Sequence, residues 1–297
     1  MKSAWLWTLL GISLKWGVVL GIGSFLFTFI LFWKNAQPPR YPSLYPESPS
    51  LPLEEITFQT EDGLRLRGSF SLRDPKRPTI LLCHGVGANR TDLYLFAQLL
   101  YEKGGFNVLS FDFRGHGQSE GRLTSYGALE QRDLEAALAF LDRRLLRREY
   151  GLLGVSMGAS VGILVASRDL RLKALWVDSP YSDLAKAIEA HLKLLYGFPK
   201  FPFVPFSLLS YRLLFHTAAE NVSPIGKIGG MVPRPLMIVN GVKDERMRPE
   251  FAKKLYEKAK EPKSLWLIPG AGHLEGHLID PKGYDERLLA FFEKAFR

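Results

Sequence analysis

Gly154-Val155-Ser156-Met157-Gly158 is the stretch of this 297-residue chain that decides its fold. An apolar run, 150–153, precedes it, and small and aliphatic residues, 159–166, follow it. The pattern predicts a strand, a sharp turn at Ser156 and a helix, with the serine hydroxyl exposed at the end of a sheet. Because the helix would begin at Met157, its free N–H groups and positive dipole end would face an anion formed beside the serine. Ser156 is therefore a candidate nucleophile, although a short glycine and serine motif also arises as a plain small-residue turn.

Segments typical of strands and helices alternate along the rest of the chain. Glu61-Asp62-Gly63 separates two strand-like runs, 56–60 and 64–70, and predicts a hairpin. The apolar run Thr79–Cys83 is typical of the middle of a parallel sheet. Further strands are expected at 106–111, 150–155, 172–177, 236–240 and 265–268, and further helices at 91–103, 126–148, 248–260 and 283–296. Such alternation predicts an α/β protein with a mostly parallel sheet and helices on both faces.

Residues 181–230 interrupt this alternation between two predicted core strands. The segment is far longer than a simple crossover requires, and it is rich in leucine, proline and aromatic residues, as in 198–206. A long insertion of this kind is typical of a lid or binding loop, so it predicts an apolar cap above Ser156. The alternative is a pair of surface helices with a small core of their own.

The N-terminal segment is predicted to be a membrane anchor. Residues 16–33 carry no charge, and as a helix they would extend about 27 Å, close to the roughly 30 Å of a bilayer's hydrocarbon core. Trp16 and Trp33 stand where an aromatic belt would lie, with Lys15 and Lys34 just outside. A cleaved signal peptide is the alternative, but the apolar run is long for one and no small-residue cleavage motif follows it.

The chain therefore divides into three expected parts: an anchor over 1–34, a proline-rich linker over 35–53 and a folded domain over 54–297. A proline-rich linker is extended and semi-rigid, so it would lift the domain off the bilayer. Basic residues flank the anchor on both sides, with a slight bias that places the N-terminus inside and the domain in an extracytoplasmic compartment. Gly17 and Gly21 fit either a helix-pairing face or a lipid-facing stretch of small residues.

Composition narrows the class of protein further. The formal net charge is +9 at pH 7, and basic residues crowd 143–148, which fits either a solvated helix face or attraction to an anionic membrane. No nucleic-acid-binding module accompanies this charge, so nucleic acid is not an expected partner. Cys83 is the only cysteine of the sequence, which excludes intrachain disulfides and metal sites built from several cysteines.

Two polar residues downstream complete a candidate catalytic cluster with Ser156. A serine hydroxyl is a poor nucleophile at neutral pH, so it needs a base in contact and an acid behind that base. Asp244 follows the strand 236–240 and His273 follows the strand 265–268, at the strand ends where active sites of parallel sheets collect. The order serine, acid, histidine is the one expected after a strand–serine–helix turn. The rival candidates are His277 for the base and Asp178 for the acid.

A negative charge that develops on a substrate oxygen would need two backbone N–H donors. Met157 supplies one from the start of its helix. The second is assigned to Val86, within His84-Gly85-Val86-Gly87, because the loop after the strand ending at Cys83 is where such a donor is expected. His84 precedes the serine in the chain and is expected to brace this loop rather than to act as the base.

Together these segments resemble the α/β-hydrolase superfamily. The match extends over about residues 54–297 and includes two further motifs, D-x-R-G-x-G-x-S within 111–119 and Asp178-Ser179-Pro180-Tyr181-Ser182-Asp183. These two patterns resemble the membrane-anchored serine hydrolases of the BEM46-like group and related monoglyceride-lipase-like and aminopeptidase-like members. Relatives that act on haloalkanes or epoxides use an aspartate where this chain has Ser156, which argues against those reactions.

The resemblance implies an α/β-hydrolase fold with a cap insertion, and a serine hydrolase that acts through an acyl-enzyme with no metal or organic cofactor. Ester or thioester bonds of apolar or lipid-like substrates are the expected targets, and the membrane is the expected partner of the N-terminal helix. Two alternatives stay open. One is a peptidase or amidase that uses the same residues, and the other is a non-catalytic, membrane-anchored binding protein that keeps the fold.

Overall fold

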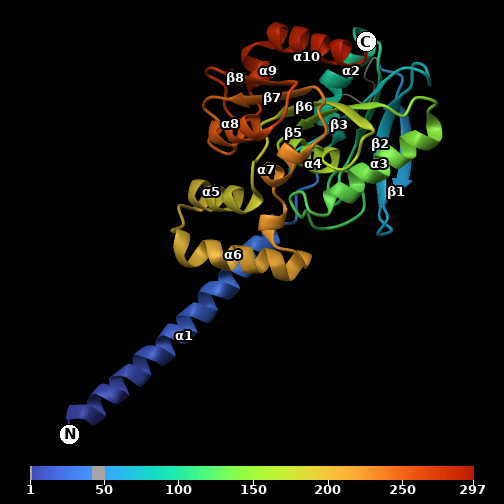
Figure 1. Ribbon diagram of the computed structural model, residues 1–297. Coiled ribbons are helices and arrows are strands. Elements are labelled where there is room, and N and C mark those ends of the chain that lie inside the picture. The colour runs from blue at the N-terminus through green and yellow to red at the C-terminus, as the bar shows by residue number, and fades with distance from the viewer. Residues whose placement is uncertain (1, 42–50) are drawn as a thin grey trace.

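The computed structural model describes residues 2–41 and 51–297, so the middle of the predicted proline-rich linker, 42–50, lies outside the described residues. Within them, eight strands form one sheet in the order β1-β2-β4-β3-β5-β6-β7-β8 (Figure 1). The strands are β1 (Glu54–Gln59), β2 (Arg65–Ser71), β3 (Thr79–Cys83), β4 (Asn107–Phe111), β5 (Tyr150–Val155), β6 (Leu172–Asp178), β7 (Leu236–Gly241) and β8 (Lys263–Ile268). The predicted hairpin β1–β2 and its neighbour β4 pair antiparallel, and the other pairings are parallel. The prediction of a mostly parallel α/β sheet is confirmed.

The register of the central strands brings polar loops to one edge of the sheet. Cys83, the last residue of β3, lies opposite Gly154 in β5. Because the strands from β3 to β8 are parallel, the loops that follow them leave from the same edge. The loop that begins with His84 therefore lies beside the turn at Ser156.

Helices cover both faces of the sheet, as predicted. They are α2 (Tyr94–Glu102), α3 (Glu130–Arg144), α4 (Met157–Ala166), α8 (Pro249–Lys258) and α10 (Pro281–Ala295), with the short α7 (Pro224–Lys227) and α9 (Gly276–Ile279). Helices α3, α4 and α8 pack on one face, and α2 and α10 pack on the other. In β3, Leu81 and Cys83 join the first core while Ile80 and Leu82 join the second. All four side chains are fully buried, which explains why the strand is apolar from Ile80 onward.

Helix α3 is shorter than the helix predicted at 126–148. It begins at Glu130 because Tyr126 and Gly127 have positive φ angles of 56° and 120°, which a right-handed helix excludes. The Glu130 carboxylate accepts hydrogen bonds of 2.8 Å from the backbone N–H groups of Ser125 and Gly127, which fixes this turn. Apolar spacing did not reveal the turn, because side-chain hydrogen bonds form it.

Two longer helices fill the insertion between β6 and β7. They are α5 (Leu184–Tyr196) and α6 (Lys200–Phe215), followed by short turns and α7. Figure 1 shows both helices apart from the sheet, on the side where α1 (Lys2–Asn35) reaches the rest of the molecule. The insertion is therefore a helical cap, and it shares a third core with residues of α1 and of the loop before α3.

Helix α1 is built into the domain, contrary to the expectation that a spacer would hold the two apart. Phe32 and, just beyond the helix end, Ala36 are buried in the same core as Tyr211 of α6. The backbone N–H of Thr124 donates to the carbonyl of Ala36 at 2.8 Å, and the Arg40 guanidinium donates to two backbone carbonyls of the loop after β4. These hydrogen bonds attach the segment at the end of α1 to the domain.

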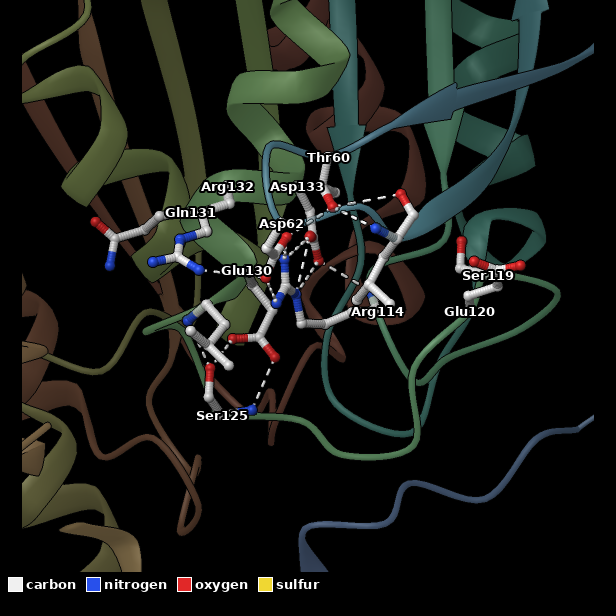
Figure 2. Close-up of polar contacts among 12 residues, drawn as sticks. Thr60, Asp62, Arg114, Ser119, Glu120, Ser125, Glu130, Gln131, Arg132 and Asp133 are labelled. Carbon is white, nitrogen blue, oxygen red and sulfur yellow. Dashed lines mark hydrogen bonds and ion pairs between the residues drawn. The ribbon is translucent and has the colours of Figure 1, made fainter. Parts of the chain in front are cut away.

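Buried charges hold the loop between β4 and α3 in place. Figure 2 shows the Arg114 guanidinium between the carboxylates of Asp62 and Asp133. Arg114 contacts Asp133 at 2.6 Å and Asp62 at 2.8 Å, and both Arg114 and Asp133 are buried. Hydrogen bonding from Arg114 holds the pKa of Asp62 well below its usual range, because it favours the ionised carboxylate. The network joins the β1–β2 hairpin to α3.

Arg114→Met is expected to lower the free energy of unfolding by about 3–5 kcal/mol, because it leaves Asp133 as an uncompensated buried charge. Urea unfolding in detergent, followed by tryptophan fluorescence, measures the change. Arg132→Met is the matched control. Arg132 contacts Asp62 at 3.2 Å from a half-exposed position, so its loss should cost less than about 1 kcal/mol. Equal losses in the two variants would contradict the role given to Arg114.

Candidate active site

Ser156 occupies a strained turn between β5 and α4. Its φ and ψ angles of 51° and −114° lie outside the regions that non-glycine residues favour. Its backbone N–H donates to the carbonyl of Asp178 at 2.8 Å, and its carbonyl accepts from the N–H of Ser160 at 3.2 Å, so the turn is fixed from both sides. The residue is 8% exposed and lines a cavity. This geometry is typical of a nucleophile held at a strand–helix turn.

The glycines of the motif are required because β5, α4 and β3 meet at close range. A Cβ atom on Gly154 would lie 2.6 Å from the carbonyl oxygen of Gly158. One on Gly158 would overlap the backbone carbonyl of Cys83. Both neighbours are backbone atoms, which cannot rotate aside as a side chain can. The close approach brings the N-terminus of α4 to the edge of the sheet beside β3.

His273 and Asp244 meet at this same edge. Asp244 lies in the loop after β7 and His273 in the loop after β8, and the N–H of Lys243 donates to the carbonyl of Ala271 at 2.8 Å, which ties the loops together. His273 Nδ1 lies 2.8 Å from Asp244 Oδ2. The other carboxylate oxygen accepts backbone N–H bonds of 2.9 and 2.7 Å from residues 246 and 247. A carboxylate held in this way favours the ring with Nδ1 protonated, so Nε2 is the nitrogen able to act as a base.

Ser156 and His273 line the same two cavities. The first has a volume of about 280 Å³ and is lined mainly by apolar side chains of α1, α5 and the start of α4. The second has a volume of about 240 Å³ and includes polar groups of His84 and Asp178 among its walls. The structure therefore gathers the predicted serine, acid and histidine at one edge of the sheet. Over the described ranges 2–41 and 51–297, no group of three or more His, Cys, Asp or Glu side chains is arranged to hold a metal ion.

The two rival residues have other partners. His277 Nε2 lies 3.1 Å from a carboxylate oxygen of Asp285. Asp178 accepts hydrogen bonds from the hydroxyl of Tyr284 at 2.8 Å and from a neighbouring serine at 2.9 Å. Both rivals line the second cavity. The acid that is hydrogen-bonded to His273 is nevertheless the one that follows β7.

Burial raises the pKa of Asp178 from its ordinary 3.8 to about 6, in spite of the hydrogen bond from Tyr284. Between about pH 4 and 6 the folded state keeps a proton that the unfolded chain has released, so the stability from this residue is present below pH 4 and is lost as the pH rises through 6. Between pH 4 and pH 7 the free energy of unfolding of the unsubstituted protein should fall because of this residue. We expect the fall to be smaller by roughly 3 kcal/mol in Asp178→Asn. Urea unfolding of both proteins at each pH measures this difference. Parallel pH profiles would show that Asp178 is ionised in the folded protein throughout.

His84 fixes the loop after β3. Its Nε2 accepts from the backbone N–H of Phe113 at 3.0 Å, and its Nδ1–H donates to the carbonyl of Gly85 at 2.7 Å. Burial lowers the pKa of His84 to about 3, so the ring is neutral and suited to this bracing role. A Cβ atom on Gly85 would lie 3.2 Å from the Cβ of Ser156, so the loop passes close to the serine. Val86 follows in this loop and lines both cavities, and its N–H stays the predicted second donor.

Residues of α1 line the first cavity, which sequence reasoning did not predict. Thr28, Leu31 and Phe32 share this cavity with Ser156. The helix is apolar around most of its circumference, so its sequence does not distinguish a side that faces protein from a side that faces lipid. Only the tertiary contacts with the cap reveal that these residues belong to the site.

A mostly parallel sheet with a strained serine between a central strand and the following helix defines the α/β-hydrolase class. The chain belongs to the alpha/beta hydrolase family, whose model matches residues 80–287. The match includes the loop after β3, the turn at Ser156, and both Asp244 and His273.

Solved structures and curated relatives agree with this family. The Pyrococcus furiosus esterase Pf2001 superposes with a TM-score of 0.72 at 25% sequence identity, covering 88% of this chain and 98% of that one. The Bacillus subtilis protein YqkD is 29% identical over 220 residues, which are 72% of this chain and 71% of the relative. The Arabidopsis thaliana alpha/beta hydrolase domain-containing protein WAV2 is 26% identical over 270 residues, covering 86% and 84%. The family and the esterase neighbour support hydrolase activity, and the narrower resemblance to the BEM46-like group stays a prediction.

Proposed function

We propose that this protein is a membrane-tethered serine hydrolase that cleaves carboxylic ester or thioester bonds of apolar, lipid-like substrates. The observation that carries the proposal is the strained Ser156 sharing an apolar cavity with His273, whose Nδ1 is held by Asp244. A serine, a base and an acid in this relation are the parts that acyl transfer requires.

The proposed reaction has two steps. The Ser156 hydroxyl attacks the carbonyl carbon while His273 Nε2 takes its proton, and the charge formed on the carbonyl oxygen is bound by the N–H groups of Val86 and Met157. Each donor would contribute about 3 kcal/mol to transition-state stabilisation. The bond to the leaving alcohol or thiol then breaks, and His273 returns the proton to that group. Water, deprotonated by the same ring, cleaves the acyl-enzyme and restores the serine, while Asp244 stabilises the imidazolium in both steps.

The walls of the first cavity favour an apolar ester over a substrate with a free amine. Its apolar lining includes Leu184, Ile188 and Leu192 of the cap. Among the described residues, no aspartate or glutamate lines this cavity, whereas Arg246 does. A peptidase that binds a substrate amine in the first cavity would need a carboxylate there, so the lining of this cavity favours an ester substrate.

Helix α1 supports a retained anchor. By length and composition, its segment Lys15–Asn35 is apolar enough to cross a bilayer, a test that a signal sequence also passes. Cleavage behind the helix would remove Phe32 from the core that it shares with the cap, so the buried position of this side chain favours retention. The arrangement of basic residues around the helix favours an extracytoplasmic domain.

The outer surface of the cap supports contact with lipid. Leu209 and Leu213 of α6 are 44% and 52% exposed, and Phe201 is 78% exposed. Helix α1 contacts α6, as in the pairing of Phe25 and Phe206 with ring centroids 5.5 Å apart. Phe25 lies well inside the segment Lys15–Asn35, so a bilayer that reached the end of this segment would bring lipid alongside these cap residues, where apolar side chains are favourable.

Activity-based labelling and ester hydrolysis test the proposal on the full chain in detergent micelles. We expect a fluorophosphonate probe to label the protein, and p-nitrophenyl esters of two to twelve acyl carbons to be hydrolysed. A non-catalytic binding protein would give neither signal. A peptidase would cleave aminoacyl p-nitroanilides, whereas the proposed esterase would leave these amides intact. Either of these outcomes would overturn the proposed ester specificity.

A further inference from the structure

We propose that the anchor helix α1 forms one wall of the acyl-binding pocket, where Leu31 and Phe32 contact the part of the acyl chain that lies away from the scissile bond. The proposal rests on the proposed function and deepens it, because it names esters of medium- to long-chain fatty acids as the substrate class. It makes α1 a determinant of specificity in addition to an anchor.

The C-terminal end of α1 is buried on one side and exposed on the other. Thr28 is 1% and Phe32 is 8% exposed, whereas Ile30 on the opposite side is 53% exposed. The Thr28 hydroxyl donates to the carbonyl of Ser24 at 2.7 Å, so its burial leaves no unpaired donor on the cavity side. The side of this helix end that carries Thr28 and Phe32 therefore faces the protein interior, where it can form a wall of the cavity.

Contacts with both cap helices hold this helix end in a fixed position. The ring of Phe32 packs edge-on against the rings of Tyr126 and Tyr211, with centroids 6.1 Å away in both cases. The Tyr196 hydroxyl of α5 donates to the Asn35 side-chain oxygen at 2.9 Å. Together with the backbone bond at Ala36, these contacts fix the helix relative to both cap helices. A wall held in this way can discriminate between chain lengths, because it does not move aside for a longer substrate.

The helix end and the reacting groups line the same cavity. The cavity of about 280 Å³ is lined by Ser156 and His273 and also by Thr28, Leu31 and Phe32. Figure 1 shows the C-terminal end of α1 reaching the rest of the molecule beside the cap helices, and residues of α1, of α5 and of the turn at Ser156 line this one cavity. With the acyl carbonyl at Ser156, an apolar course for the chain within these walls leads toward the helix.

The test places a larger side chain in this cavity wall, in the full-length protein. Leu31 is half-buried and lines the cavity, whereas the adjacent Ile30 is exposed and does not, so Leu31→Trp and Ile30→Trp form a matched pair. In detergent micelles we expect L31W to lower kcat/KM at least tenfold for the decanoate and dodecanoate p-nitrophenyl esters and to leave the acetate and butyrate esters within twofold. We expect I30W to stay within twofold of the unsubstituted protein for every ester.

Leu31→Ala, which enlarges the cavity, provides an independent variant and is expected to raise the preference for dodecanoate over butyrate. A short-chain fluorophosphonate labels all variants that fold, so a lost long-chain activity with normal labelling reports selectivity rather than misfolding. Chain-length profiles that stay parallel in L31W and L31A would overturn the inference while leaving the proposed function intact. If the unsubstituted protein neither hydrolyses esters nor reacts with the probe, both proposals fail together.

Discussion

Ser156→Ala is expected to lower kcat for ester hydrolysis by roughly 10⁵- to 10⁶-fold and to abolish labelling by a fluorophosphonate. The reason is that the acyl-enzyme forms on the serine oxygen, and neighbouring groups alone can only assist direct attack by water. The substitution removes one oxygen atom from the edge of a cavity, so the fold should survive. Steady-state kinetics on p-nitrophenyl butyrate and gel-based labelling measure the two effects.

Ser167→Ala is the matched control for this experiment. Ser167 lies at the other end of α4, where its hydroxyl donates to the carbonyl of Leu164 at 2.7 Å. Its loss should leave kcat within twofold. Residual activity of Ser156→Ala above about 1% of the unsubstituted rate would mean that another residue is the nucleophile, and the acyl-enzyme mechanism would have to be abandoned.

Asp244→Asn is expected to reduce kcat by about 10³- to 10⁴-fold with little change in KM. An asparagine amide would present a donor or a weaker acceptor to His273 Nδ1, so the ring would lose both its preferred tautomer and the charge that stabilises the imidazolium. Because the residue acts through His273 and does not touch substrate, binding should be less affected than the chemical step. Full kcat and KM values for one ester distinguish these effects.

Asp178→Asn separates the two candidate acids. Asp178 is hydrogen-bonded to Tyr284, while Asp244 is the carboxylate 2.8 Å from His273. We therefore expect Asp178→Asn to retain activity within about tenfold at pH 8. A large loss in this variant together with a small one in Asp244→Asn would move the orienting role to the residue after β6.

The fold class could be predicted because its signals are local. A strand such as β3, buried on both faces, is largely apolar, and the turn at Ser156 requires glycines at fixed offsets because backbone approaches backbone there. The start of α3 escaped prediction, since the turn before it depends on the Glu130 side chain reaching back to two N–H groups. Such a bond changes where a helix begins without altering the apolar pattern.

The candidate site was predictable in its residue types and only partly in its contacts. The positions of Asp244 and His273 after consecutive strands indicated that they lie at one sheet edge. The choice between Asp178 and Asp244 depended on which side chain reaches the imidazole, and the tertiary structure provides that contact. The catalytic roles of these residues stay predictions for the kinetic experiments above.

The sequence by itself determined the alternation of strands and helices, the strained serine turn and the apolar N-terminal helix, because each depends on residues close together in the chain. Tertiary structure alone decided that α1 is part of the cap core and that Leu31 and Phe32 share a cavity with Ser156. An apolar helix surface packs equally well against lipid or protein, so its composition cannot tell which one it meets. Side chains more than ninety positions away in the chain, among them Tyr126 and Tyr211, determine that the end of α1 packs against protein. Their arrangement exists only once the sheet and the cap have formed.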